Sequence, residues 1–222
     1  MQEVRRTATT ANAILGLLAL RQEWPTYILT KQLRRNMRFF WPRAESRIYD
    51  EAKQLVSRGL ATARREHDGK RTRTVYAITE AGRRTLGRWL ATPPRGTALE
   101  CEGLLRVFLA DFSTRDQLRA ALDQVQADAE AILAVGRVVG PEYLRGTAPF
   151  QDQVHVRALV FDFLWSHATM LQRWAERTAA AIERWEESSP TERTEDAIEV
   201  IRSHLAVDTG GPGWERTNGR QS

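Results

Sequence analysis

The stretch "PRAESRIYDEAKQLVSRGLATARREHDGKRTRTVYAIT", Pro42 to Thr79, decides the fold because its hydrophobic period changes halfway along. In its first half, apolar residues recur at the spacing of a helix, at Ile48, Ala52, Leu55 and Val56. Gly59 then provides a typical helix end. In its second half, β-forming segments flank Asp68-Gly69, a dipeptide that favours a tight hairpin turn. The stretch therefore predicts a helix followed by a β-hairpin.

The segments on either side add three more helices. An apolar pattern at helical spacing covers 10–21, and a second helix is expected over 25–36, opened by a proline that is favoured in a first turn. After the hairpin, Thr79 is placed to cap a helix over 80–91. Three helices, a hairpin and a helix follow each other in the order of a winged helix-turn-helix domain.

The third helix and the hairpin carry side chains that suit DNA. In a helix-turn-helix, the second helix of the pair enters the major groove, where its first residues reach the bases. Arginine binds guanine through two hydrogen bonds, whereas basic side chains beside the phosphates add affinity without reading sequence. The hairpin would then be the wing, with its charge facing the DNA backbone. The expected DNA contacts are Tyr27, Arg43, Ser46, Arg47, Tyr49 and Lys53 from the helices, and Arg64, Arg65, Lys70, Arg71 and Arg73 from the wing.

The charge of the chain is divided unevenly. Residues 1–92 contain 19 Lys and Arg against 8 Asp and Glu, and residues 93–222 contain 14 against 20, so their formal charges are +11 and −6. This asymmetry indicates a nucleic-acid-binding half and a half with another role. Two alternatives stay open. The tip of any hairpin must be polar, and a winged helix can also bind a protein or coat DNA without reading its sequence.

Three segments resemble the winged-helix domain of PadR-type transcriptional regulators. They are "ILGLLAL" (14–20), "FFWPRAESRIYDEAKQLVSRGLATARRE" (39–66) and "TVYAITEAGRRTLGRWLATPP" (74–94). The resemblance implies a DNA-binding regulator. Trp24-Pro25 departs from the small residue and glycine that often precede the second-helix tyrosine of the family. Asp50 also departs, because it puts an acid on the face that meets the groove and so bears on which operator is read.

The rest of the chain is expected to be helical. A short apolar helix covers "ECEGLLRVFLADF", and a long helix follows Ser113, which with Asp116 resembles a capping box. The glycines and prolines of "RVVGPEYLRGTAPF" (137–150) are expected to end that helix. A second long helix is expected over 151–187, and "TEDAIEVIRSHLA" adds a short one.

The second long helix carries two apolar stripes, which is more than one neighbouring helix covers. A second copy of the chain is the simplest cover, and the weaker PadR-type resemblance of this half also implies a homodimer. An alternative is that Trp165, Met170 and Trp174 line a pocket for a small hydrophobic or aromatic effector, the kind of compound to which PadR-type proteins commonly respond. The expected dimerisation residues are Phe161, Leu164, Ala168, Leu171, Trp174, Ile182 and Trp185. The stripe beside them contains Phe163, Met170 and Trp174.

These patterns predict a mainly α protein with a small β-hairpin. We expect a winged helix-turn-helix domain (1–94), a helical dimerisation domain that could also bind an effector (95–206) and a disordered tail (207–222). The four histidines lie far apart, Cys101 is the sole cysteine and no phosphate loop is present, so we expect no enzyme activity, metal or cofactor. The predicted protein is cytoplasmic and makes no membrane contact. Its predicted function is sequence-specific transcriptional regulation. It would act as a repressor on an inverted-repeat operator in double-stranded DNA, and an effector or a partner would release it.

Overall fold

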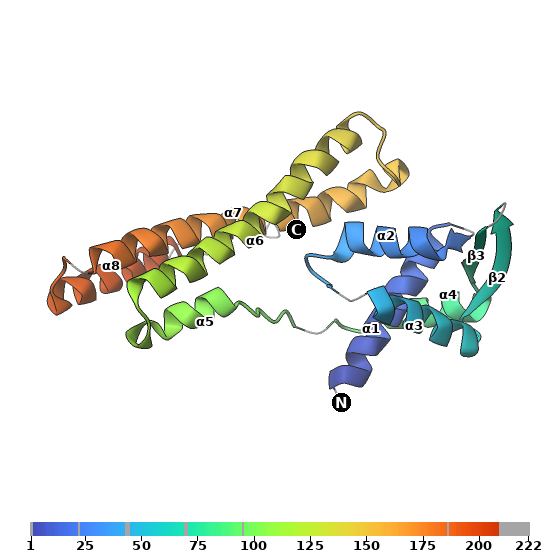
Figure 1. Ribbon diagram of the computed structural model, residues 1–222, viewed down its shortest axis with the longest axis horizontal. Coiled ribbons are helices and arrows are strands. Elements are labelled where there is room, and N and C mark those ends of the chain that lie inside the picture. The colour runs from blue at the N-terminus through green and yellow to red at the C-terminus, as the bar shows by residue number, and fades with distance from the viewer. Residues whose placement is uncertain are drawn as a thin grey trace, which may run out of the picture. The chain divides into compact units, whose positions relative to one another are not determined.

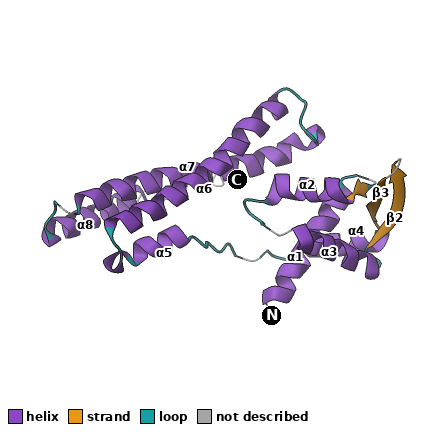
Figure 2. Ribbon diagram, viewed as in Figure 1, coloured by secondary structure: helices purple, strands orange, loops and turns teal. Residues whose placement is uncertain are grey.

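The computed structural model describes residues 2–21, 23–42, 45–68, 71–94, 96–185 and 187–208. The chain forms two compact units, Met1–Ala98 and Leu99–Ser222. The first unit combines helices with a small sheet, and the described part of the second is helical (Figure 2). Among the residues described, no helix is long and apolar enough to cross a membrane.

The first unit has the predicted winged helix-turn-helix order (Figure 1). Strand β3 lies in the middle of its sheet and pairs antiparallel with both β1 and β2. The elements are α1 (Gln2–Ala19), β1 (Trp24–Pro25), α2 (Thr26–Met37), α3 (Glu45–Ser57), β2 (Ala61–Asp68), β3 (Arg71–Ile78) and α4 (Glu80–Leu90).

Local backbone preferences explain how these elements begin and end. Gly59 has a φ of +67°, a left-handed conformation that glycine adopts without strain, and it turns the chain from α3 toward β2. Thr79 caps α4 as predicted, because its side chain accepts a hydrogen bond from the Gly82 amide at 3.1 Å. Pro25 differs from expectation. It belongs to β1, where it pairs with Val75, and α2 begins one residue later.

Helix α1 is the centre of the first unit. It packs against α2, α3, α4 and β3, and it begins well before the expected Thr10. Its apolar face is fully buried, together with one large residue from β1, one from α2 and one from α3. The most deeply buried large side chains of this unit are Ile14, Leu15, Leu18, Trp24, Leu29 and Leu55.

The second unit is built on two long helices that pack against each other, α6 and α7 (Figure 1). The buried contact joins an apolar row of α6, formed by Leu118, Leu122, Val125, Ala129 and Leu133, to Ala168, Ala175 and Ile182 of α7. The elements are α5 (Glu102–Phe108), a short 3-10 helix (Ala110–Phe112), α6 (Arg115–Leu144), a second 3-10 helix (Gln151–Gln153), α7 (Val154–Arg184) and α8 (Pro190–Asp208). Residues 209–222, most of the expected disordered tail, lie outside the described residues.

Helix α6 corrects two sequence expectations. Its capping box uses Thr114 and Gln117 rather than Ser113 and Asp116. It also continues through its glycines and Pro141 to Leu144 instead of ending near 137. The glycines are packing positions: a Cβ on the glycine at 136 would lie 2.9 Å from ring atoms of a tryptophan in α7. The Trp165 ring therefore requires a residue without a side chain at position 136, whereas a Cβ on Gly140 would make only ordinary contact with Phe161.

Glu51 is an acidic residue buried in the core of the first unit. Its side chain is only 2% exposed, and its Oε1 has no hydrogen-bond partner among the described residues. Burial raises the pKa of Glu51 above its usual value, and the charges of Arg58 and Arg47 oppose this shift in part. The folded protein therefore holds this proton more tightly than the unfolded chain does, so its stability falls as pH rises through the raised pKa.

Two glycines of α4 provide a matched test of the packing. A Cβ on Gly82 would lie 2.1 Å from the backbone oxygen of Leu60 and 2.8 Å from Cγ1 of Ile78, whereas no atom lies within 4 Å of that position on Gly87. We expect Gly82→Ala to lower the free energy of unfolding by about 1–3 kcal/mol. Gly87→Ala should raise it by about 0.5–1 kcal/mol. Urea denaturation of both variants measures this, and equal effects would contradict the close approach of α4 to Leu60.

We also predict that Glu51→Gln stabilises the protein at pH 7, by on the order of 1 kcal/mol, because it removes the cost of burying a charge. The advantage should shrink as pH falls and Glu51 of the native protein becomes protonated. Urea denaturation across this pH range measures the difference. Glu80→Gln, an exposed change on α4, is the control and should show little effect. An advantage for Glu51→Gln that grows toward acid pH would contradict the assignment.

Candidate nucleic-acid interface

A basic hollow of about 350 Å³ lies on the helix-turn-helix pair, between α2 and α3. Four of its lining side chains are basic, and none is acidic. We call this surface the α2 groove. Its lining residues are Tyr27, Thr30, Lys31, Arg34, Arg35, Arg38 and Tyr49.

The basic residues of the α2 groove share one face because of their spacing. Lys31, Arg34, Arg35 and Arg38 follow each other at i, i+3, i+4 and i+7, the period of a helix. Leu29 and Leu33 occupy the buried face of α2. These four basic residues are not among the DNA contacts predicted from the sequence. The run "KQLRRNMR" carried the signal, since a helical period applies to charge as it does to hydrophobicity.

The predicted contacts on and before α3 differ in their exposure, and one of them lies outside the described part. Ser46 and Arg47 are exposed in the first turn of α3, and Tyr49 is half-buried in the α2 groove. Lys53 is exposed and lies 3.7 Å from a carboxylate oxygen of Asp50, a surface ion pair of small energetic value. The predicted contact Arg43 lies outside the described residues.

Tyr27 brings the start of α2 into the same surface. Its side chain is 58% exposed although it is aromatic, and it lines the α2 groove together with Tyr49 of α3. Exposed aromatic side chains with a hydroxyl tip suit an interface that is partly wet. Tyr27 and Tyr49, both predicted from the sequence, therefore line the same hollow as the basic row that was not predicted.

The wing balances part of its own charge. Arg64 forms ion pairs with both Glu23 and Glu66. Arg73 donates from its Nε to Glu66 Oε2 at 2.9 Å. The Arg73 guanidinium, with Arg64 beside it, lowers the pKa of the Glu66 carboxyl. Two of the predicted phosphate contacts are thus already held by acids of this unit.

The remaining wing cations differ in what the structure describes. Arg65 is exposed and pairs across the hairpin with Thr74. Lys70 and the side chain of Arg71 lie outside the described residues. In the described part of the first unit, the larger cluster of basic side chains therefore lies on α2 rather than on the hairpin.

The predicted dimerisation residues are largely engaged inside the chain. Ala168 and Ile182 are buried against α6, and Leu171 and Trp174 pack beside them. Phe161 stacks on Trp165 with ring centroids 5.6 Å apart. Leu164 is half-buried and Trp185 is 38% exposed. The first stripe of α7 is therefore covered mainly by α6 of the same chain.

The second stripe of α7 is exposed only in part. Of its predicted members, Phe163 and Met170 are 62% and 50% exposed, whereas Trp174 packs beside the core. Val156 and Val160 lie at helical spacing from Phe163 and are 49% and 37% exposed, so the exposed row comprises Val156, Val160, Phe163 and Met170. We call these four residues the outer stripe. Large apolar side chains at this density on a surface are typical of a contact with another molecule.

The residues proposed for an effector pocket do not come together. Trp174 belongs to the core, Trp165 lies on Phe161 and Met170 is exposed in the outer stripe. A hollow of about 430 Å³ does exist in this unit, but other residues line it. Among the described residues, no group of three or more His, Cys, Asp and Glu side chains could hold a metal ion.

Comparison with known proteins agrees with this geometry. Residues 14–88 match the model of the transcriptional regulator PadR-like family. The chain is 30% identical over 135 residues to the negative transcriptional regulator PadR of Bacillus subtilis (strain 168), a match that covers 55% of this chain and 74% of that protein.

Solved structures of that relative are also similar to this one. The structure of Bacillus subtilis PadR in complex with operator DNA matches with a TM-score of 0.64 and 25% identity over 78% of this chain and 98% of that one. Its complex with p-coumaric acid matches with a TM-score of 0.61 and 23% identity over 80% and 97%. The chain therefore belongs to the PadR-like family of DNA-binding transcriptional regulators.

Proposed function

We propose that this regulator is a homodimeric repressor that binds an inverted-repeat operator and releases it when a small effector or a partner binds. The observation that carries the proposal is the surface formed by the α2 groove and the exposed start of α3. It combines exposed Ser46 and Arg47, side-chain types that can bind base edges, with a row of four basic side chains. The relative from Bacillus subtilis, a negative regulator solved with operator DNA, supports the repressor and operator parts.

In this proposal, the two parts of the surface have different roles. Arg47 and Ser46 at the start of α3 read base edges in the major groove. Lys31 and Arg38 bind the phosphates beside that groove, which positions the helix without reading sequence. The exposed hydroxyl of Tyr27 adds a further phosphate contact.

In this proposal, the wing contributes fewer phosphate contacts than its sequence suggests. Arg64 and Arg73 would have to exchange their acidic partners for phosphate, which reduces the net gain. Arg65, Lys70 and Arg71 remain the proposed wing contacts.

The dimer is proposed to form through the outer stripe, since α6 already covers the first stripe. Two copies would then present two copies of α3, with half-sites about 10–10.5 base pairs or a multiple apart. An effector that favours another separation of the two would release the operator.

The alternative function is an interaction module that coats DNA without reading it. The ion pair between Lys53 and Asp50 favours this alternative. It engages two exposed side chains of α3 that could otherwise form hydrogen bonds with bases. Such a module would show a steep dependence on salt and no operator preference.

We predict that Arg47→Ala relaxes sequence preference and costs about 1–3 kcal/mol of binding free energy on the operator. Arg38→Ala should weaken binding to operator and scrambled DNA alike and reduce the salt slope by about one contact. Operator selected from genomic fragments, titrated at several salt concentrations, provides the measurement. Arg177→Ala, an exposed change on α7, is the control and should bind as the native protein does. If Arg47→Ala and Arg38→Ala weaken binding to operator and scrambled DNA in the same way, the result would favour the alternative, a module that coats DNA without reading its sequence.

The assembly is tested by two glutamates placed on different stripes of α7. Phe163→Glu puts a charge on the outer stripe and should separate the dimer while the helices stay folded. Leu171→Glu puts the charge against α6 and should unfold the second unit itself, since an unpaired buried charge is costly. Sedimentation at micromolar concentration and far-UV circular dichroism distinguish the two results. A stable Phe163→Glu dimer would show that the outer stripe is not the interface.

A further inference from the structure

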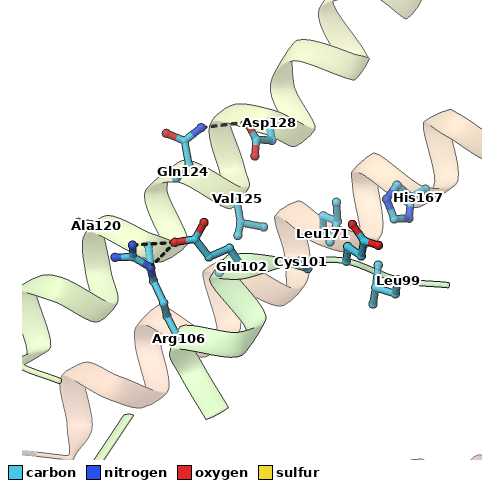
Figure 3. Close-up of a pocket in the computed structure, with 13 residues that line it drawn as sticks. Leu99, Cys101, Glu102, Arg106, Ala120, Gln124, Val125, Asp128, His167 and Leu171 are labelled. Carbon is cyan, nitrogen blue, oxygen red and sulfur yellow. Dashed lines mark hydrogen bonds and ion pairs between the residues drawn. The ribbon is translucent and has the colours of Figure 1, made fainter. Parts of the chain in front are cut away.

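A hollow of about 430 Å³ lies in the second unit where α5, α6 and α7 meet. This volume falls within the range of small-molecule sites. Figure 3 shows that Glu102 and Arg106 come from α5, Gln124 and Asp128 from α6, and His167 from α7. We call it the α5 hollow. None of the residues that the sequence assigned to an effector lines it.

The polar part of the α5 hollow is mainly acidic. Three carboxylates line it, those of Glu100, Glu102 and Asp128, against the single guanidinium of Arg106. Arg106 donates from Nε and from one terminal nitrogen to the same oxygen, Glu102 Oε1, at 3.0 and 2.7 Å. Asp128 accepts through Oδ1 from Gln124 Nε2 at 2.8 Å (Figure 3). Glu102 and Asp128 each keep a second oxygen that can accept from a ligand.

The other part of the α5 hollow is apolar. Leu99, Val125 and Leu171 line it, and His167 adds a ring that stacks parallel to Phe163 at 6.2 Å between centroids. A flat apolar body can pack against such a wall while a charged end reaches the carboxylates.

Gly103 sets how closely α5 approaches α6 at this place. A Cβ on Gly103 would lie 2.3 Å from Cγ2 of Val125 and 3.3 Å from the backbone oxygen of Ala121. Helix α5 therefore packs closely against α6. Glu102, which precedes Gly103 in α5, lies at the edge of the hollow. Glu102 on α5 and Asp128 on α6 are therefore carried by two packed helices, whereas Glu100 lies in the segment before α5.

We propose that the α5 hollow binds a small amphiphilic cation, an aromatic or aliphatic body that carries an amine. The preponderance of carboxylates favours a positive ligand group and disfavours a carboxylate. The relative from Bacillus subtilis was solved with p-coumaric acid, which is an acid. This chain is thus proposed to select the opposite charge.

Binding here would act on the connection to the DNA-binding unit. Leu99, Glu100 and Cys101 line the hollow and are also the first residues of the second unit, immediately after the boundary at Ala98. A ligand that contacts them restricts the path of the chain that leads to the winged helix. Its effect on DNA affinity must then be matched by an equal effect of DNA on ligand affinity. This regulatory half of the inference rests on the proposed function.

The test uses tyramine and p-coumarate, two para-substituted phenols of similar size and opposite charge. Isothermal titration of the full chain with each measures affinity directly, in the absence of DNA. We expect tyramine to bind at least about tenfold more tightly than p-coumarate, the factor that one favourable contact supplies. Equal binding, preference for p-coumarate, or no binding of tyramine at millimolar concentration would overturn the proposal.

Two variants locate the site. The double change Glu102→Gln and Asp128→Asn should remove the preference for tyramine while the apolar wall stays intact. Ala120→Trp, on the exposed part of the lining, should fill the hollow and reduce binding of both compounds. Asp123→Asn on the same helix does not line the hollow and is the matched control. Tyramine binding that survives both site variants would place the ligand elsewhere and overturn the assignment.

Operator binding measured with and without tyramine separates the two proposals. A chain that binds its operator but not tyramine would overturn the α5 hollow alone. A chain that binds tyramine without binding any operator would overturn the proposed function and leave the ligand site standing. Release of the native protein by tyramine, lost in the double variant, is the result expected if both are correct.

Discussion

Burial of α1 is the interaction on which the DNA-binding surface depends. Its apolar face contacts every other helix of the first unit and β3, and Ile14, Leu15 and Leu18 are almost wholly removed from water. The connection between α2 and α3 is also tied to it, because Trp41 Nε1 donates to Thr10 Oγ1 of α1 at 3.3 Å. Since α2 and α3 are both placed against α1, their mutual angle is set by a shared core rather than by the turn between them. That angle determines whether the α2 groove and the start of α3 can meet one nucleic acid.

The second unit is governed by the amount of apolar surface on α7. Helix α6 covers one side of it through small and aliphatic residues, and the outer stripe remains exposed. Closer approach of the two helices is limited where large side chains meet, and the glycines of α6 admit Phe161 and Trp165 at its far end. Helix α5 packs against α6 in the same way, through Gly103, and the α5 hollow is the space left between these three helices. The core contact, the proposed dimer surface and the proposed ligand site thus all involve α6 or α7.

The basic side chains of the first unit differ in whether they form ion pairs with acids of the same unit. In the wing, cross-strand neighbours place Glu66 beside Arg73, and Glu23 reaches Arg64, so part of the positive charge is neutralised within the unit. In the α2 groove, by contrast, the four basic side chains line one hollow that has no acidic lining residue. The clustering of basic side chains in one groove, rather than the number of arginines in a segment, is what supports the α2 groove as the candidate nucleic-acid interface.

Local sequence patterns by themselves determined the order of the helices and the hairpin in the first unit, the cap at Thr79 and the winged helix-turn-helix class. These features depend on the hydrophobic period and the backbone preferences of residues that are close together in the sequence. The basic face of α2 is also written in the sequence, because Lys31, Arg34, Arg35 and Arg38 recur at helical spacing. It did not find the strand at Trp24, because two residues form a strand only when β3 is already beside them.

Only the tertiary structure decided which stripe of α7 is buried, that α6 runs through Gly140 and Pro141, and which wing arginines are paired. A sequence shows that a helix has two apolar stripes, but not which one its own chain covers. That choice depends on contacts between residues that are distant in the sequence, such as Leu133 and Ala168, and the packing of whole helices decides which residues meet.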